Sequence, residues 1–217
     1  AALRRARASL PAAAPPKSQP HAALPLFQRL GEEEGVPLKG TKDWSGKALG
    51  SDCDALGGML SSGALAEVDG LNLRANGINA TGIQVITAVI KSTPGCLRSL
   101  RDLTLYNNLV GDAGMIAIAS VIASGSLPQI VSLSMGGNNI ADAGIKAFSS
   151  ALLADPLPSL VSLQFTHNQI GDLGLVALAG GLAQPNVLPA LRTLLLGGNR
   201  IGDEGASALA NALASSR

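Results

Sequence analysis

Apolar residues along this chain return in one fixed phrase about every thirty residues. The phrase reads L-x-x-L-x-L-x-x-N-x-L, and residues 100–110 show it clearly. Five copies centre on Asn76, Asn108, Asn138, Asn168 and Asn199, with spacings of 32, 30, 30 and 31 residues. A constant period of this length predicts a solenoid, because each thin unit can bury its apolar face only against the next unit.

A weaker copy precedes the five. Trp44, Lys47 and Leu49 stand where Leu105, Asn108 and Val110 stand in the clearer copy, and Lys42 replaces a core leucine. Loss of apolar residues is expected of a terminal unit, which faces water on one side. The chain is therefore predicted to hold about six units over residues 41–217.

Each phrase predicts a short strand that leads into a turn. Leu103 and Leu105 are expected to point inward, whereas Thr104 and Tyr106 point outward, because side chains alternate along a strand. Each repeated asparagine is expected to use its amide to bond backbone groups that the ending strand leaves unpaired. This structural role accounts for the asparagines without a binding function.

A helix is predicted after each strand, because apolar residues recur four positions apart and form one buried stripe. The pairs are Ile86 and Ile90, Ile118 and Ile122, Phe148 and Leu152, Leu178 and Leu182, and Leu209 and Leu213. Aspartate is a favourable N-cap, so Asp112, Asp142, Asp172 and Asp203 are predicted to cap the helices that they open. Ser51 occupies this place in the first unit, and Asn79 lies beside it in the second.

The phrases L-x-L-x-x-N-x-I-G-D-x-G, as in Leu194 to Gly205, carry a family resemblance. They resemble the ribonuclease-inhibitor type of leucine-rich repeat, which also occurs in Ran GTPase-activating proteins and in the sensor regions of NOD-like receptors. The resemblance covers roughly residues 41–217. It implies an α/β solenoid, a curved stack with parallel strands on the concave face and helices on the convex face. It implies little about function, because one fold hosts many partners.

Residues 1–40 differ from the repeats and are predicted to form an extended, basic, Ala/Pro-rich arm that holds a short helix. Residues 1–31 contain five basic residues and no acidic residue. This composition indicates an organelle transit peptide, with a disordered basic tail as the alternative. A plastid is slightly favoured over a mitochondrion, and a cytoplasmic location is the alternative. Leu24, Phe27 and Leu30 are predicted either to anchor the arm on a partner protein or to cover the chain's own first repeat.

Residues that could carry catalysis or hold a cofactor are scarce. The chain has no G-x-x-x-x-G-K-[ST] phosphate loop, and two cysteines and two histidines are too few for a usual zinc site or a disulfide framework. The net charge of +1 gives no strong field toward nucleic acid, and no apolar run approaches the roughly 20 residues of a membrane span. We therefore expect no enzyme activity, no cofactor or metal, no nucleic-acid partner and no transmembrane segment. Peripheral association with a membrane through a partner stays open.

The outward strand positions are the predicted binding surface. One column reads Asp43, Asn72, Thr104, Ser134, Gln164 and Leu195, and the next reads Ser45, Arg74, Tyr106, Gly136, Thr166 and Gly197. Such a small, polar and nearly uncharged face suits a peptide or protein bound by hydrogen bonds, with a plain solvated face as the alternative. Tyr and Arg are common anchors at interfaces. The candidate partner-binding residues are Asn72, Arg74, Asp102, Thr104, Tyr106, Gln164, Thr166, His167 and Leu195, together with Leu24, Phe27 and Leu30 in the arm.

The C-terminal end is a second candidate surface. Leu194, Leu195 and Leu196 make the last predicted strand unusually apolar. An uncovered apolar edge tends to pair with another chain, so this end is predicted to dock on a neighbouring subunit. The alternative is that water simply covers it.

These features together predict a non-catalytic protein–protein interaction module. We expect it to serve as an accessory or scaffold subunit of a larger multi-subunit complex, in an organelle if residues 1–31 are a transit peptide. One alternative is a regulator of a small GTPase, for which no catalytic residue can be matched. Another is a ligand-sensing repeat domain, which would need a nucleotide-binding domain that this sequence does not contain.

Overall fold

A computed structural model describes residues 24–33 and 35–215. The strands are β1 Lys39–Asp43, β2 Glu67–Asn72, β3 Asp102–Thr104, β4 Ser132–Ser134, β5 Ser162–Gln164 and β6 Thr193–Leu195. The helices are α1 Leu24–Leu30, α2 Cys53–Ser61, α3 Ala80–Ser92, α4 Gly111–Ile122, α5 Asp142–Ala154, α6 Asp172–Leu182 and α7 Asp203–Ser215, and a 3₁₀ turn, η2, spans Leu49–Ser51. Strand–helix units 1 to 6 therefore run from β1–α2 to β6–α7.

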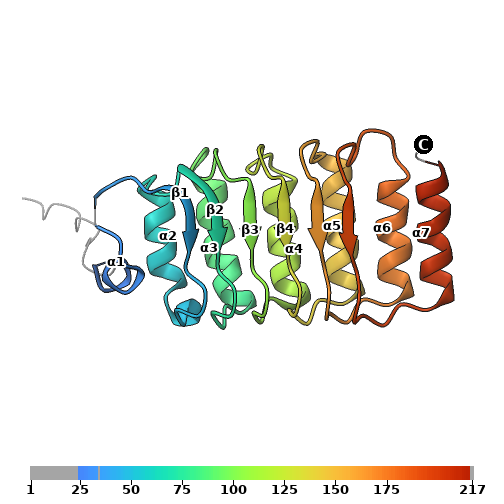
Figure 1. Ribbon diagram of the computed structural model, residues 1–217, viewed down its shortest axis with the longest axis horizontal. Coiled ribbons are helices and arrows are strands. Elements are labelled where there is room, and N and C mark those ends of the chain that lie inside the picture. The colour runs from blue at the N-terminus through green and yellow to red at the C-terminus, as the bar shows by residue number, and fades with distance from the viewer. Residues whose placement is uncertain (1–23, 34, 216–217) are drawn as a thin grey trace, which may run out of the picture.

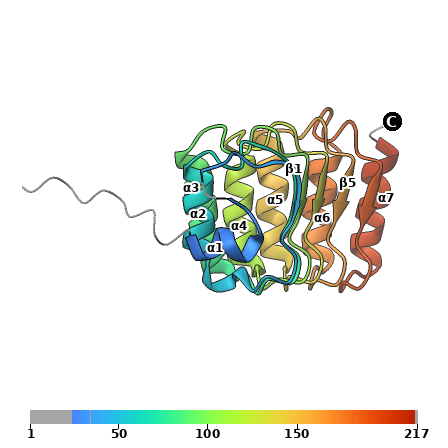
Figure 2. The same cartoon turned by 60° about the vertical axis from the view of Figure 1, so that its left-hand side comes forward.

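The six strands form one parallel sheet in sequence order. Helices α2 to α7 stand in a row along one face of this sheet and leave its opposite face uncovered by helices (Figures 1 and 2). The register places Leu71, Leu103, Leu133, Leu163 and Leu194 opposite one another. Lys42 stands opposite Leu71 in the first strand, as expected of a terminal unit. The predicted α/β solenoid of about six units is confirmed.

The repeated asparagines bond backbone groups at the strand ends, as predicted, and the structure adds that many of these groups belong to the preceding unit. The side-chain amide of Asn108 donates to the backbone oxygens of Leu73 and Leu105 at 2.9 and 2.8 Å. Its oxygen accepts from the backbone N–H groups of Asn76 and Ile78 at 3.1 and 3.0 Å. Because these groups lie in the buried turn, the ladder satisfies polar atoms that water cannot reach.

The prediction that each aspartate caps its own helix is wrong. Asp142 is the first residue of α5, and its Oδ1 instead accepts the backbone N–H of Gly171 at the start of α6, at 2.6 Å. Asp112 accepts in the same way from Ala141 and Gly144 before and within α5. Stacked helices bring the first turn of one beside the N-terminus of the next, so the carboxylate reaches across units rather than along its own chain.

Asp172 continues this pattern, since its Oδ1 accepts from Gly202 and Gly205 at 2.7 and 3.0 Å. Asp203, in the last unit, accepts no hydrogen bond within the described residues. In the second unit Asn79 caps its own helix by accepting from Gly82, as predicted. Ser51 caps no helix, because α2 has no side-chain cap and the Ser51 hydroxyl lies against Asp52.

Helix α1 covers the first unit of its own chain. Leu26, Phe27 and Leu30 are buried in the continuous core, and Arg29 pairs with Asp52 at 2.6 Å. Of the two predicted roles for Phe27 and Leu30, the structure has the second, a cover over the first repeat, so the prediction that they anchor a partner is wrong. Part of the predicted arm therefore belongs to the folded stack, whereas residues 1–23 and the side chain of Leu24 lie outside the described residues.

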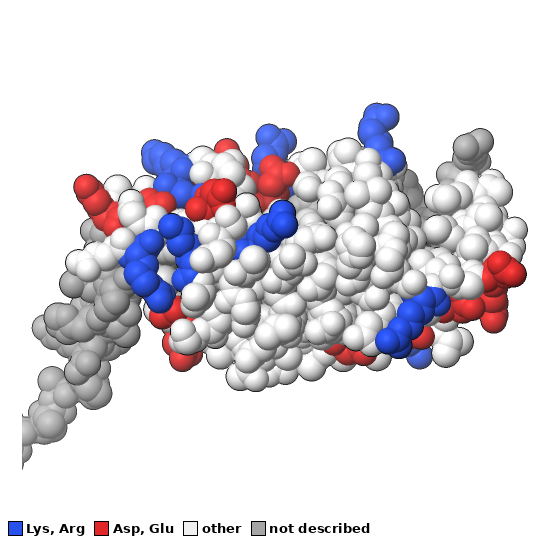
Figure 3. All heavy atoms as spheres, turned by 60° about the horizontal axis from the view of Figure 1, so that its bottom comes forward, with Lys and Arg blue, Asp and Glu red and all other residues white. Residues whose placement is uncertain are grey.

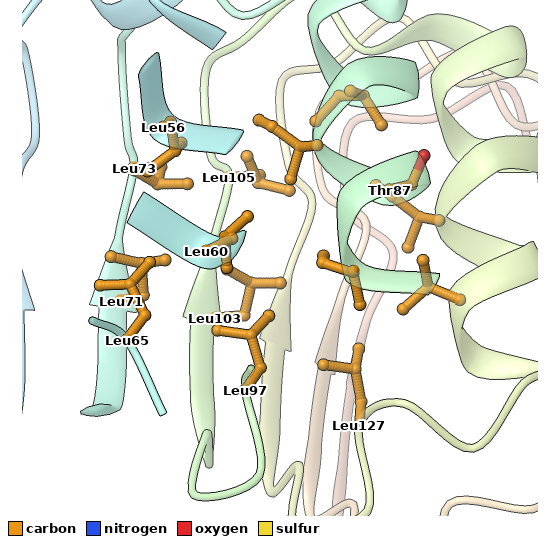
Figure 4. Close-up of a pocket in the computed structure, with 15 residues that line it drawn as sticks. Leu56, Leu60, Leu65, Leu71, Leu73, Thr87, Leu97, Leu103, Leu105 and Leu127 are labelled. Carbon is orange, nitrogen blue, oxygen red and sulfur yellow. The ribbon is translucent and has the colours of Figure 1, made fainter. Parts of the chain in front are cut away.

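The core runs the length of the stack but is packed unevenly. Units 1 to 3 enclose a cavity of about 50 Å³, lined by aliphatic side chains and Thr87 (Figure 4). Further along, Phe148 and Phe165 are fully buried and meet edge to face, with ring centroids 5.4 Å apart. The apolar pair of the last helix, α7, differs from the pairs of the earlier helices, because Leu209 is only half-buried and Leu213 is exposed.

Candidate functional site

The candidate site lies on the sheet side of the stack, on two columns of outward residues that we call the strand face. The first column is Asn72, Thr104, Ser134, Gln164 and Leu195, and the second is Arg74, Tyr106, Gly136, Thr166 and Gly197. In the first column the strand register places the residues side by side. In the second, hydrogen bonds between neighbouring turns do so, as from the N–H of Asn107 to the oxygen of Gly136 at 2.8 Å.

A stacked pair dominates the second column. The guanidinium carbon of Arg74 lies 5.0 Å from the centroid of the Tyr106 ring, which is within the range of a cation–π contact. The ring in turn lies across Gly136, because a Cβ at that glycine would be 2.5 Å from Cε2 of Tyr106 and 2.7 Å from Oγ1 of Thr166. Arg74, Tyr106 and Thr166 thus form one ridge over a glycine platform.

The remaining predicted residues have different surroundings. Asn72 accepts from the backbone N–H of Arg74 at 3.1 Å and so shapes the turn below the stacked pair. Gln164 is half-buried and accepts from the Ser134 hydroxyl at 3.4 Å, which links two units of the first column. Thr104 is half-buried, and Asp102 and Leu195 are exposed. The structure brings Arg74, Tyr106 and Thr166 together and leaves Asp102 and Leu195 apart from them.

His167 is exposed in a turn conformation that the repeat imposes. Its φ of 55° lies in the left-handed region, and so does the φ of the residue before the repeated asparagine in other units, for example Ala75, Asn107 and Gly198. A Cβ at Gly198 would lie 2.5 Å from Nδ1 of His167, so the imidazole lies over that glycine. The unusual φ is therefore explained by the shared turn and does not by itself indicate a catalytic histidine.

Charge is concentrated toward the first units. In the view of Figure 3, most Lys, Arg, Asp and Glu side chains gather toward one end, a smaller group lies at the other end, and a broad uncharged surface lies between them. Lys39 pairs with Glu67 at 3.0 Å in this charged part, and Thr41 donates to Asp69 at 3.0 Å. Hydrogen bonds from the side chain and backbone of Ser45 lower the pKa of Asp43. Beyond unit 3, the residues of the strand face carry no charge, and their polar members can only form hydrogen bonds.

The described residues offer little reactive chemistry. No three of their His, Cys, Asp and Glu side chains gather as metal ligands would. Cys53 and Cys96 are buried as free thiols, and burial raises the pKa of both, which keeps them protonated and unreactive. None of the described helices is both long and apolar enough to span a bilayer.

Two surface features were not found from the sequence. The sequence places Gly136 in its column but does not show that it is the platform beneath Tyr106. The outer side of the helices also exposes Ile116, Leu173 and Val176. These three residues sit among alanines in helices that are apolar nearly all round, so the periodicity that finds a buried stripe does not distinguish them.

Comparison with protein families supports the repeat assignment. A family model described as Leucine Rich repeat matches residues 128–149, 157–179 and 188–210, which are the strands and first helical turns of units 4 to 6. A search of curated protein sequences found no match.

Comparison with solved structures gives distant likenesses. The actin-binding site 2 of leiomodin-1 is 17% identical with a TM-score of 0.46, covering 73% of this chain and 86% of that one. An internalin from Listeria monocytogenes str. 4b F2365 is 19% identical with a TM-score of 0.28, covering 76% and 68%. Both scores lie below 0.5, so neither likeness bears on what this chain binds. The repeated phrase, the parallel sheet in register and the matched repeats together identify this chain as an α/β leucine-rich-repeat solenoid.

Proposed function

We propose that this chain is a non-catalytic protein-interaction module that binds a partner protein across its strand face, as an accessory or scaffold subunit of a larger assembly. The observation that carries the proposal is the ridge in which Arg74 stacks on Tyr106 and the ring lies over Gly136. Arg and Tyr are the residue types that most often dominate interface energetics.

The ridge is suited to binding because it is already ordered. A side chain that is fixed before binding loses little conformational entropy when a partner arrives, and this loss commonly costs about 0.5–1.5 kcal/mol for each flexible side chain. Tyr106 is held between the Arg74 guanidinium and the glycine platform, and it is half-buried while Arg74 is exposed. The outward donors of Arg74 fit a carbonyl or carboxylate of the partner.

The uncharged part of the strand face complements the ridge. Thr166 places its hydroxyl beside the Tyr106 ring over Gly136, and Ser134 and Gln164 add a hydroxyl and an amide, bonded to each other, in the first column. Hydrogen bonds from such groups fix the register of a bound segment, whereas the aromatic ring supplies buried apolar area. We therefore expect a partner segment that lies across units 2 to 5 with an apolar contact over Tyr106.

We further assign the repeats to the ribonuclease-inhibitor type, since helices α3 to α7 span 11 to 13 residues each within units of 30 to 32 residues. For location we propose an organelle, with a plastid favoured, from the basic and acid-free composition of residues 1–31. A fluorescent fusion of the full chain that stays in the cytosol would reject that location.

The binding proposal is tested by quantitative co-purification from the source cells. Proteins retained by the wild-type chain are compared with those retained by Tyr106→Ala and by Tyr106→Phe. Lys146→Ala, an exposed change on helix α5, serves as the control. We expect Tyr106→Ala to lose the specific partner about tenfold or more, as removal of a dominant interface residue does. Tyr106→Phe and Lys146→Ala should retain it, and equal retention by all variants would contradict the proposal.

A further inference from the structure

An open hollow lies between two neighbouring return loops, which are the segments that lead from α4 to β4 and from α5 to β5. Its volume is about 290 Å³, and residues within 125–130 of one loop and 155–159 of the next line it. Leu127 and Leu157 are buried and form its floor, whereas three exposed prolines stand at its rim, which are Pro128, Pro156 and Pro158. Because proline fixes its own φ and stiffens the chain, this apolar wall is formed before anything binds.

One carboxylate lines the hollow. Asp155 directly follows α5 and is half-buried. Its Oδ2 lies against the preceding loop, since a Cβ at Gly125 would be 3.3 Å from that oxygen. Among the residues that the structure describes, no group donates a hydrogen bond to this carboxylate and no Lys or Arg pairs with it. The hollow therefore holds a negative charge that no described part of the chain neutralises.

The ends of two helices add to this negative potential. Helix α4 ends at Ile122 and α5 at Ala154, and the C-terminus of a helix carries a partial negative charge. Neither helix has a basic residue in its last turn. Pro156 and Pro158 have no N–H group, so they cannot donate to the carbonyls of Leu152 and Ala154 as a further helical turn would. Together with Asp155, these helix ends favour a cation at the hollow.

Asp155 stands at a place where a carboxylate is unfavourable. The macrodipole repels a negative charge beside the C-terminus of a helix, whereas a lysine or arginine is favoured there. Residues that break such a local rule are expected mainly at functional sites, where binding compensates for them. The position of Asp155 therefore fits a binding role better than a structural one.

We propose that this hollow, which we call the Asp155 notch, binds a lysine or arginine side chain of a partner protein. Such a side chain joins an aliphatic stem to a cationic end. The stem packs against the leucines and prolines, and the charged end reaches Asp155 beside the helix ends. A metal ion fits less well, because no three metal-ligating side chains of the described residues gather. A small molecule fits less well too, since ligand pockets commonly have volumes of about 300–1,000 Å³.

The Asp155 notch is separate from the ridge on the strand face. The notch precedes β4 and β5, whereas Tyr106 follows the end of β3, and the strands are parallel. The two sites therefore lie toward opposite ends of the strands. The proposal depends only on the two return loops and the helices before them, so it stands or falls independently of what the ridge binds.

Nuclear magnetic resonance titration of the ¹⁵N-labelled 217-residue chain tests the proposal. The probes are the capped amino acids Nα-acetyl-lysine amide and Nα-acetyl-arginine amide, and Nα-acetyl-norleucine amide supplies an aliphatic stem without the charge. We expect both cationic probes to shift the amide signals of Gly125, Asp155 and Leu157 saturably. These shifts should weaken as the salt concentration rises, because salt screens the charge. The norleucine probe should shift the same signals far less.

Asp155→Asn should weaken the binding of both cationic probes about tenfold, because a hydrogen bond to a charged group is lost while the shape of the notch stays. Asp203→Asn is the matched control, since Asp203 is an exposed aspartate at the start of α7, and it should bind the probes as the wild type does. Urea unfolding without any probe supplies a second readout. Asp155→Asn should raise the urea midpoint, because a charge that the helix ends repel is removed, whereas Asp203→Asn should not.

Three results would overturn the proposal. In the first, the cationic probes shift none of the three signals, or bind Asp155→Asn as tightly as the wild type. In the second, the norleucine probe binds as well as the lysine probe, which would make the notch merely an apolar hollow. In the third, Asp155→Asn lowers the urea midpoint, which would show that the carboxylate serves the fold.

Discussion

Units 1 to 3 and units 4 to 6 share one repeat phase but differ in how they are held together. The first three enclose an aliphatic cavity of about 50 Å³, whereas the later units contain the Phe148–Phe165 contact. The helices differ as well, because α5, α6 and α7 receive a carboxylate from the preceding unit at their N-termini, whereas α2 and α4 have no side-chain cap. Units 4 and 5 are therefore more firmly packed than units 1 to 3, whereas the core residues of unit 6 are only half-buried.

Different residues at equivalent positions of the repeat account for this difference. Ile86 and Leu105 occupy the positions that Phe148 and Phe165 occupy two units later, and both line the cavity. Helix α4 lacks a carboxylate because Ala80 stands where Asp112 stands in the next unit. In a linear repeat protein, the stability of each unit and of its contacts with its neighbours adds to the total. Such residue differences therefore determine which units are most stable.

The difference also bears on the candidate site. Arg74 and Tyr106 come from units 2 and 3, above the cavity, whereas Gly136 and Thr166 come from units 4 and 5. The stacked pair of Arg74 and Tyr106 thus belongs to the looser units 1 to 3 and lies on a platform supplied by the more firmly packed units 4 and 5.

The largest effect is expected from removing the ring contact. Phe165→Ala should lower the free energy of unfolding by about 3–5 kcal/mol, because a fully buried ring leaves a cavity that the neighbours fill only in part. Leu105→Ala is the matched change in unit 3, beside the existing cavity, and should cost less. Urea unfolding followed by circular dichroism measures both, and an equal or larger loss in Leu105→Ala would remove the contrast between the halves.

A smaller effect is expected from the carboxylates that cap across units. Asp142→Ala should cost about 1–2 kcal/mol, because the N-terminus of α6 loses the acceptor of Gly171, as in other cap deletions. Asp203→Ala is the control, since Asp203 accepts no hydrogen bond within the described residues, and it should stay within about 0.5 kcal/mol. Faster amide exchange at the start of α6, rather than of α5, would locate the lost bond. Exchange that rises at α5 instead would restore the view that each aspartate serves its own helix.

The period alone was enough to predict the strands, their register and the asparagine ladder, because these follow from residues that recur at one phase. It could not show that Asp112 and Asp142 serve the next helix, since spacing along a chain does not say which neighbour a side chain reaches. The burial of Phe27, the position of Tyr106 over Gly136 and the cavity also depend on three-dimensional packing. The two columns of the candidate site could be predicted from the sequence, but the ridge formed by Arg74, Tyr106 and Thr166 could not.

Filling the cavity should reduce the contrast between the halves. Leu105→Phe places in unit 3 the ring that Phe165 supplies in unit 5, and we expect a gain of about 0.5–2 kcal/mol. Met135 is the equivalent inward residue of unit 4 and is fully buried, so Met135→Phe should instead lower the free energy of unfolding by about 1–3 kcal/mol through overpacking. If the two variants shift the urea midpoint equally, the cavity does not distinguish the halves.

The smallest effect concerns the two thiols, both in the first half of the stack. Cys53 and Cys96 are buried and their pKa values are raised, so labelling of the native chain should be slow and should speed up as the pH rises toward those values. A thiol reagent reaches these cysteines when the units around them unfold locally. If this local unfolding is confined to units 1 to 3, Phe165→Ala in unit 5 should leave the labelling rates nearly unchanged. Rates that rise with the global destabilisation would show instead that the stack opens as one body.

The ridge itself can be observed through one residue, because Tyr106 is the only tyrosine in the chain. Nuclear magnetic resonance of the chain labelled only at tyrosine gives ring signals that belong to Tyr106 alone. We predict nuclear Overhauser contacts from this ring to Gly136 and Thr166 in the free protein, and a clear shift of the ring signals when the co-purified partner is added. Ring signals that show no such contacts, or that stay unchanged at saturating partner, would contradict the proposal that the strand face binds through this ridge.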